Sequence, residues 1–242
     1  MKVYDSIADA LACVQSNQTI MVGGFGLIGA PLTLIDGLIE KDANGLTIIS
    51  NNLGEKGEGL GLLLQQKKVR KAIGSYFTSN RDVGDAYQAG ELEIQLLPQG
   101  TLAESIRAGG AGIGGYYTKT AVGTDLAKGK ETKMINGVEY VFEEALRADV
   151  ALVRAHKADT LGNVVYYKTA RNFNPLMATA ADHVIVEVDE IVEVGQLSAE
   201  EIVTPHLFVD GLVVAKKVLT KGGIVNHDKQ REYTNVNRRT GS

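Results

Sequence analysis

The first half of the chain alternates between short apolar runs and segments whose apolar residues recur at helical spacing. Residues 19–25 (TIMVGGF) end in glycines and predict a buried strand. Pro31 then suits the first turn of a helix, because its missing N–H costs nothing there. Leu32, Ile35 and Leu38 form the apolar face of that helix. A first helix is predicted before the strand at 19–25, capped by Asp5 or Ser6, with Ile7, Leu11 and Val14 as its apolar face. Further strands are predicted at 46–50, 69–77 and 92–98, and further helices at 59–68, 81–89 and 101–108.

This alternation of strand and helix predicts a mostly parallel, open α/β sheet flanked by helices. An antiparallel insertion interrupts it, because Asn136-Gly137 separates two strand-like runs and is the strongest short signal for a hairpin with a two-residue turn. Residues 107–118 precede the insertion and are dense in glycine, which predicts a loop. Later strands are predicted at 149–155, 163–167, 183–194 and 207–215.

No linker or internal repeat divides the chain. We therefore expect one domain over residues 1–220, followed by a polar segment, 221–242, that is either a frayed tail or an arm docking on a partner. A net charge of −4 gives no electrostatic footprint for nucleic acid. The apolar stretches are too short to cross a bilayer, and Asp5 and Asp9 lie where a signal peptide needs apolar residues. The one cysteine, Cys13, cannot form an internal disulfide, so a reducing cytoplasm is the default location. Cys13 itself is expected to pack on a helix.

Metal-dependent and nucleophilic-serine chemistries find no motif in the sequence. The histidines are scattered without metal-ligand spacing, and neither H-E-x-x-H nor C-x-x-C occurs, so we expect no bound metal. G-x-S-x-G and G-K-[ST] are absent as well. His183 begins an apolar strand and is expected to be a hydrogen-bonded core histidine.

The most informative stretch is VGGFGLIGAP, residues 22–31. Read from Gly24 it spells G-F-G-L-I-G, the spacing of a dinucleotide-binding turn between a strand and a helix. A nicotinamide-dependent oxidoreductase also needs an acidic residue at the end of the next strand, to bind the ribose hydroxyls. Here Asn51 and Asn52 follow that strand, so the Rossmann-type interpretation fails this requirement and is the weakest alternative.

The same stretch resembles the G-G-F-x-x-x-G-x-P signature of the first subunit of family I CoA-transferases. Gly23, Gly24, Phe25, Gly29 and Pro31 fill its fixed positions. ISNNLG, LLPQGTLAESIRAGGAG and TARNFNP resemble further blocks of the 3-oxoacid and acetate CoA-transferase branch. The blocks follow the family's order and cover most of residues 1–220. The chain is therefore similar to the alpha subunit of such an enzyme.

The resemblance implies transfer of CoA from an acyl-CoA of acetoacetyl, succinyl or acetyl type to a free carboxylate, through a covalent intermediate on a glutamate. In the family this glutamate lies in a Ser-Glu-Asn-Gly motif of the second subunit, and the motif is absent here. Glutamates at 143–144 and 200–201 are expected to lie on solvated faces. Because the chain also ends before a second domain, we expect a beta subunit to supply the nucleophile in an alpha2beta2 assembly, with coenzyme A as substrate and no permanently bound cofactor.

The expected site residues follow predicted strands. Gln99 lies just before a helix predicted to begin at Thr101, where its amide can donate to a developing oxyanion. Asn51 and Asn52 suit polar groups of CoA or of the carboxylate. The glycine turn brings backbone N–H groups against the same ligand, with Phe25 as an apolar wall. The turn residues expected to bind ligand are Gly23, Gly24, Phe25, Gly26 and Gly29.

Plainer functions remain open for each of these residues. The turn glycines can serve helix–strand packing alone, Asn51-Asn52 can be a turn or a cap, and Gln99 can cap the helix after it. The roles of the glycine loop 109–115 and of Asn172 and Asn174 are open between the substrate pocket, the subunit interface and a passive connection. A non-catalytic acyl-CoA-binding module of the same fold also remains an alternative.

Overall fold

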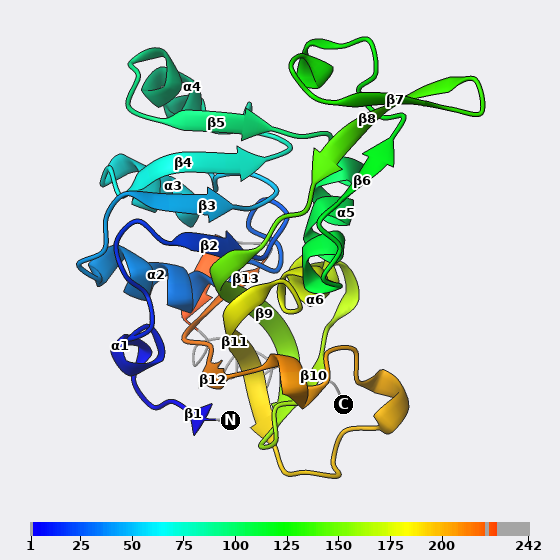
Figure 1. Cartoon of the computed structure of the whole chain (residues 1–242). Coiled ribbons are helices and arrows are strands. Elements are labelled where there is room, and N and C mark those ends of the chain that lie inside the picture. The colour runs from blue at the N-terminus through cyan, green and yellow to red at the C-terminus, as the bar shows by residue number, and fades with distance from the viewer. Residues whose placement is uncertain (1, 221–222, 227–242) are drawn as a thin grey trace, which may run out of the picture.

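A computed structural model of the chain describes residues 2–220 and 223–226. Within them the centre of the fold is a nine-stranded sheet (Figure 1). From edge to edge its strands are β1 (Lys2–Val3), β12 (Gly211–Val214), β11 (Ala181–Val192), β9 (Ala148–Asp159), β2 (Thr19–Val22), β3 (Leu46–Ile49), β4 (Val69–Gly74) and β5 (Glu93–Leu96). β10 (Val164–Val165) pairs antiparallel with β9, whereas the described neighbours along the sheet pair in parallel.

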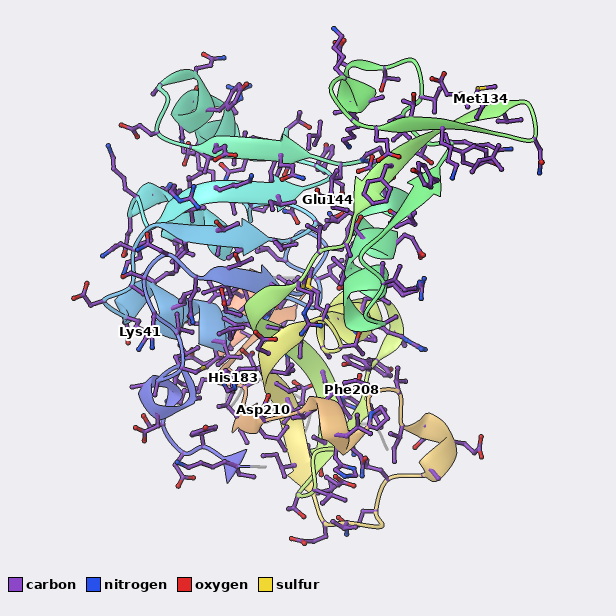
Figure 2. All side chains as sticks on the ribbon, in the orientation of Figure 1. Lys41, Met134, Glu144, His183, Phe208 and Asp210 are labelled. Atoms are coloured by element: carbon purple, nitrogen blue, oxygen red, sulfur yellow. The ribbon has the colours of Figure 1, made fainter. Side chains whose placement is uncertain are left out.

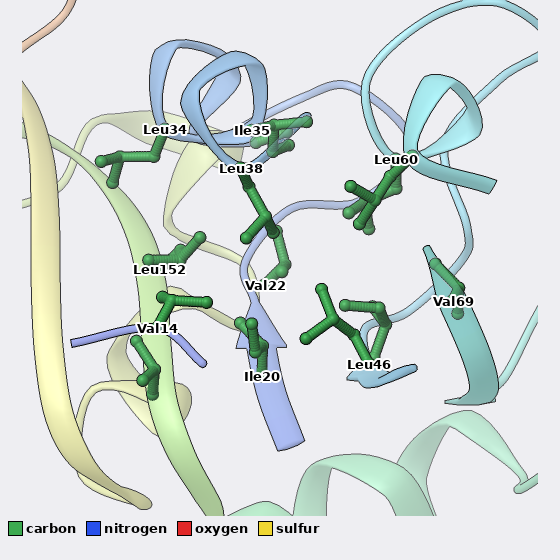
Figure 3. Close-up of a cluster of buried hydrophobic side chains, with 14 of the residues drawn as sticks. Val14, Ile20, Val22, Leu34, Ile35, Leu38, Leu46, Leu60, Val69 and Leu152 are labelled. Carbon is green, nitrogen blue, oxygen red and sulfur yellow. The ribbon is translucent and has the colours of Figure 1, made fainter. Parts of the chain in front are cut away.

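Helices cover both faces of the sheet, as the α/β pattern predicts. One face packs against α1 (Ile7–Ala10), α2 (Leu32–Glu40), α3 (Leu60–Gln65) and α4 (Arg81–Gln88), and the other against α5 (Gln99–Gly110) and α6 (Asn174–Met177). Successive residues of a strand serve opposite cores, since side chains alternate across a sheet. Ile20 and Val22 belong to the first core, shown in Figure 3, whereas Met21 belongs to the second. The predicted open, mostly parallel α/β sheet is confirmed.

The strand order reverses its direction between β2 and β9. From β2 the chain adds β3, β4 and β5 on one side, and β9, β11 and β12 then fill the other side. In open α/β sheets, ligands bind outside the carboxyl ends of the strands at such a switch point. The glycine turn follows β2 directly, so the fold places it at this position.

The antiparallel insertion forms a three-stranded sheet of its own in the order β6 (Gly115–Thr118), β8 (Val138–Glu144) and β7 (Thr132–Ile135). Figure 1 shows the β7–β8 hairpin extending away from the large sheet, with Met134 near its tip in Figure 2. Asn136 and Gly137 both have positive φ, 50° and 76°, as a type I′ turn requires. The predicted hairpin is confirmed.

Several predicted boundaries are wrong. The loop predicted over 107–118 is helical up to Gly110 and forms a strand from Gly115, because burial of Leu102, Ile106 and Ala108 outweighs the low helix propensity of glycine. The helix predicted to begin at Thr101 begins two residues earlier, at Gln99. In the first helix only Ile7–Ala10 is regular, and β2 ends at Val22 rather than at residue 25. A 3-10 helix, His206–Phe208, replaces the start of the strand predicted at 207–215.

The end of the described chain forms a two-stranded hairpin. β13 (Lys217–Thr220) pairs antiparallel with β14 (Gly223–Asn226), so part of the predicted polar tail is regular structure. Residues 227–242 of that tail lie outside the described residues, and the domain boundary at residue 220 stays a prediction. In the described part of the chain, no helix is both long and apolar enough to cross a membrane.

Candidate active site

The glycine turn at the switch point is a closed two-residue turn anchored to the neighbouring strand. The Gly23 N–H donates to the Leu152 carbonyl of β9 (N···O 3.0 Å). Phe25 and Ile28 exchange two backbone hydrogen bonds of 2.9 and 3.1 Å. Their side chains are half exposed, 50% and 46%, at the tip of the turn. An apolar pair therefore faces solvent at the carboxyl edge of the sheet.

Two asparagines of the TARNFNP block hold this turn. Asn172 accepts the Gly24 N–H through Oδ1 (3.1 Å) and donates from Nδ2 to the Ile28 carbonyl (2.9 Å). Asn174 is fully buried and donates from Nδ2 to the Gly29 carbonyl (2.9 Å). Both asparagines therefore support the glycine turn, and a contact of either with substrate or a partner subunit stays open.

Close packing explains the glycines at positions 23 and 29. A Cβ on Gly23 would lie 1.8 Å from Asn174 Oδ1, and one on Gly29, whose φ is +70°, would lie 2.4 Å from the Ala170 carbonyl oxygen. Close packing of the turn backbone against Asn174 and Ala170 therefore requires glycine at these two positions. Gly26 differs, because a Cβ there would meet nothing within 4 Å, so this part of the turn faces open space. Contact of the turn with a ligand stays a prediction.

The structure brings the predicted carboxamides together. Gln99 donates from Nε2 to Asn51 Oδ1 (2.9 Å), and the same oxygen accepts the Ser75 hydroxyl (2.8 Å). Asn52 accepts the Gly26 N–H through Oδ1 (3.0 Å) and so joins this group to the glycine turn. Asn51 and Asn52 are buried, at 1% and 3% exposure, whereas Gln99 is exposed. Gln99 makes no side-chain cap to its helix.

Two backbone donors of the turn are used within the fold. The N–H groups of Gly24 and Gly26 bind Asn172 and Asn52, whereas contact of the turn with a ligand stays a prediction. These are also the amides that a dinucleotide phosphate would require. The Gln99 amide has two N–H groups, of which one binds Asn51. Its second N–H has no protein partner among the described residues, so the exposed side chain can donate it to another molecule.

Sequence analysis missed a buried carboxylate next to this site. Glu187 of β11 is fully buried and accepts the Thr33 and Leu34 N–H groups at the start of α2 through Oε2 (2.9 and 3.0 Å). Burial raises the pKa of Glu187 to about 7, although the nearby Arg154 guanidinium and the α2 amides act to lower it. A charge within the apolar run VIVEV was the available signal, since a buried carboxylate requires partners.

The predicted exposure or burial of other side chains is confirmed at some positions and wrong at Glu143 and His183. Glu200 and Glu201 are exposed as predicted, but Glu143 is buried. Lys130 Nζ compensates the buried carboxylate of Glu143 by donating to both of its oxygens (2.7 and 2.8 Å). His183 is exposed at the start of β11 (Figure 2) and is not a core histidine, since its strand only enters the core at Val184. Cys13 packs against the first core, as predicted, but it lies in the turn after α1 and not on a helix. Among the described residues, no three or more acidic, histidine or cysteine side chains are grouped to hold a metal ion.

Comparison with known proteins identifies the family. The profile of the coenzyme A transferase family matches residues 4–215. The chain belongs to the coenzyme A transferase family. Its glycine turn and carboxamide group therefore lie at the switch point of a CoA-transferase fold.

Similar CoA-transferases cover nearly the whole chain. One subunit of a succinyl-CoA:3-ketoacid coenzyme A transferase from Xanthomonas campestris pv. campestris (strain B100) is 51% identical, over 88% of each chain. The alpha subunit of an acetate CoA-transferase from Escherichia coli (strain K12) is 45% identical, over 88% of this chain and 96% of its own. The fold matches an acyl-CoA transferase from E. coli O157:H7, solved as a thioester complex with CoA, with a TM-score of 0.78 and 22% identity. That match covers 88% of this chain, which spans about half, 47%, of the E. coli O157:H7 chain.

Proposed function

We propose that this chain is the alpha subunit of a two-subunit CoA-transferase, which moves CoA from an acyl-CoA to a free carboxylate. The observation that carries the proposal is the contact of Gln99 with Asn51 at the switch point, beside the half-exposed Phe25. This arrangement offers a directed N–H donor and an apolar surface, but no nucleophile. The Xanthomonas and E. coli K12 relatives are each named as one subunit of their enzyme, which supports a partner for this chain as well.

The nucleophile is proposed to be a glutamate of a beta subunit, within a Ser-Glu-Asn-Gly motif that this sequence lacks. Its carboxylate adds to the thioester carbonyl, and CoA leaves as thiolate, so that an acyl-glutamyl anhydride forms. The thiolate then attacks the glutamyl carbonyl, releases the first carboxylic acid as its anion and gives a glutamyl-CoA thioester. The acceptor carboxylate reverses these two steps and leaves as the new acyl-CoA.

Gln99 is proposed to stabilise the oxyanion in these additions. Each addition places negative charge on a former carbonyl oxygen, and one preorganised donor to such an oxygen contributes roughly 2.7–4 kcal/mol. The bond to Asn51 Oδ1 fixes the orientation of the Gln99 amide, and Ser75 fixes Asn51 in turn. Preorganisation matters because a donor that is already oriented pays no reorganisation cost during the reaction.

The remaining site residues are proposed to shape the pocket. Phe25 is the apolar wall. Asn51 and Asn52 are buried beneath the pocket, where Asn51 orients the Gln99 amide and Asn52 holds Gly26 of the turn. Gly23, Gly24 and Gly29 keep the turn closely packed on the fold, and Gly26, which faces open space, is the turn glycine proposed to lie next to the ligand. The substrate class is a short acyl-CoA of acetoacetyl, succinyl or acetyl type with a small carboxylate acceptor. CoA enters as substrate with no permanent cofactor, and we propose an alpha2beta2 enzyme of the cytoplasm.

Purification of the chain with and without its beta subunit tests the proposal. The chain alone should give no turnover of acetoacetyl-CoA with succinate, or of succinyl-CoA with acetoacetate, and the reconstituted pair should be active. Full turnover by the isolated chain would refute the division of roles. Tight acyl-CoA binding by the isolated chain, with no gain of activity from any partner, would favour the acyl-CoA-binding module. Calorimetric binding of NAD or NADH would favour the oxidoreductase.

A further inference from the structure

Helix α2 begins without a cap of its own. Its N-cap residue is Pro31, which offers no side-chain acceptor, so the first N–H groups of the helix need a partner from elsewhere. Glu187 supplies it from β11, 154 residues from Thr33 along the chain. One carboxylate oxygen of Glu187 accepts both the Thr33 and the Leu34 N–H (2.9 and 3.0 Å). The start of α2 is therefore fixed by a residue of the sheet.

Glu187 is itself held by a chain of charged residues that leads to the surface. Its Oε1 lies 3.7 Å from Arg154 Nε and has no hydrogen-bond partner in the part of the chain that the structure describes. Arg154 also donates to the Ala155 carbonyl (2.8 Å) and pairs with Asp189, which contacts His156 Nδ1 (3.0 Å). From β9 and β11 the charged or titratable groups are thus Arg154, His156 and Asp189, and α2 adds the partial positive charge of its N-terminus.

Strand β9 also holds the glycine turn, at a point before it and at a point after it. Before the turn, Gly23 is bound by the Leu152 carbonyl of β9. After the turn, Gly29 is bound by Asn174, whose Oδ1 accepts the Arg154 N–H of β9 (2.8 Å). Glu187 of β11 then fixes the helix that follows. The turn between these anchors places Gly26 against Asn52, next to Asn51 and Gln99.

We infer that Glu187 is a positioning residue for CoA transfer: by holding the start of α2, it sets the position of the glycine turn relative to Gln99. The inference rests on the proposed function. It requires the length of Glu187, because its oxygen must reach the two α2 amides. A role in stability alone would depend on burial and charge, without changing the rate of an enzyme that is still folded.

Two variants of Glu187 separate length from charge. E187Q keeps the length and an oxygen acceptor for the two amides but removes the charge. E187D keeps the charge but withdraws the carboxylate by about one C–C bond, about 1.5 Å. A displacement of about 1 Å in a site can cost about 100-fold in rate. The inference predicts that kcat of E187Q stays within about threefold of wild type and that kcat of E187D falls at least about tenfold, with a smaller change in KM for acyl-CoA.

D159N is the matched control. Asp159 is another buried carboxylate (2% exposed) that accepts backbone N–H groups, from Leu161, Gly162 and Asn163. It lies five residues beyond Arg154 on β9, about 16 Å along the strand. D159N should lower the melting temperature and leave kcat unchanged.

The experiment compares the variants as complexes with the beta subunit, with amide hydrogen exchange of the 33–34 segment as a second readout. In E187D, but not in D159N, these amides should exchange faster. The inference is overturned if E187D has wild-type kcat, or if E187D retains more activity than E187Q. If E187D does not assemble, exchange in the isolated E187D chain decides, and wild-type protection at 33–34 overturns the inference. An inactive wild-type complex would refute the proposed function. The exchange rates of the 33–34 amides would still show whether Glu187 holds the start of α2.

Discussion

Replacement of Gly23 by alanine tests the close packing that holds the site together. The new Cβ would lie 1.8 Å from Asn174 Oδ1 and 2.6 Å from its Cγ. Asn174 cannot turn aside cheaply, because it is fully buried and its side chain binds the Arg154 N–H and the carbonyls of Gly29 and Ala170. Overpacking of this kind costs about 1–3 kcal/mol. Each lost hydrogen bond costs about 0.5–1.5 kcal/mol more.

With two of these bonds lost, G23A is expected to lower the free energy of unfolding by about 2–6 kcal/mol. In a chain of this size that corresponds to a fall in melting temperature of about 4–24 °C, measured by calorimetry. G84A is the control: Gly84 is exposed in α4, a Cβ there meets nothing within 4 Å, and the change should stabilise by about 0.5–1 kcal/mol.

A double-mutant cycle with N174A isolates the steric contribution. N174A alone should destabilise the protein, because the Arg154 N–H loses its acceptor. In the N174A background, however, G23A should cost at least about 1 kcal/mol less than in wild type, since the clashing atoms are gone. A melting temperature of G23A within about 1 °C of wild type would refute this reasoning, and so would strictly additive effects of the two substitutions.

Three further substitutions test the electrostatics. Q99A should lower kcat of the complex about 100-fold or more, with little change in melting temperature, as steady-state kinetics and calorimetry would measure; unchanged kcat would remove Gln99 from the mechanism. Burial raises the pKa of Glu187 from 4.5 to about 7. The contribution of Glu187 to the free energy of unfolding is therefore complete below pH 4.5, and about 3 kcal/mol of it is lost as pH rises through about 7. Urea unfolding of E187Q should lack this fall, and an identical pH dependence would contradict the burial argument. Burial acts to raise the pKa of Asp159, but hydrogen bonds from Asn163 and the turn amides outweigh burial and hold the pKa below its usual range. The ionised Asp159 therefore stabilises the fold above about pH 4, and this stabilisation is lost as pH falls through the folded pKa. D159N should cost about 1–3 kcal/mol at pH 7 and show less acid destabilisation, and a wild-type unfolding curve would contradict this.

Local signals in the sequence predicted the parts of the fold that depend on local chemistry. The strand, glycine turn and helix around residues 19–40 combine a buried apolar run, glycines and Pro31, which all favour the same structure. Asn136-Gly137 predicted its hairpin because a type I′ turn requires positive φ at both positions. Strand ends also assigned Gln99 and Asn51 to one candidate site, and the two side chains meet because the carboxyl ends of parallel strands share one edge.

Contacts between distant segments could not be predicted in this way. Asn174 meets Gly23 and Gly29 from far along the chain, and no local pattern reveals that a glycine is required by an asparagine elsewhere. Glu187 serves as the cap of α2 for the same reason, although its charge within an apolar run indicated a partner. The glycines of segment 107–110 predict a loop, but the segment is helical, because tertiary packing outweighs the low helix propensity of glycine.

The central claim is that this chain positions the substrate while the reacting carboxylate belongs to another polypeptide. The most direct test incubates the reconstituted complex with acyl-CoA, traps the glutamyl-CoA thioester by borohydride reduction or hydroxylamine, and locates the modified residue by peptide mass spectrometry. The account predicts one modified glutamate, on the beta subunit, and an unmodified alpha chain. A modified carboxylate on any residue of this chain would contradict it.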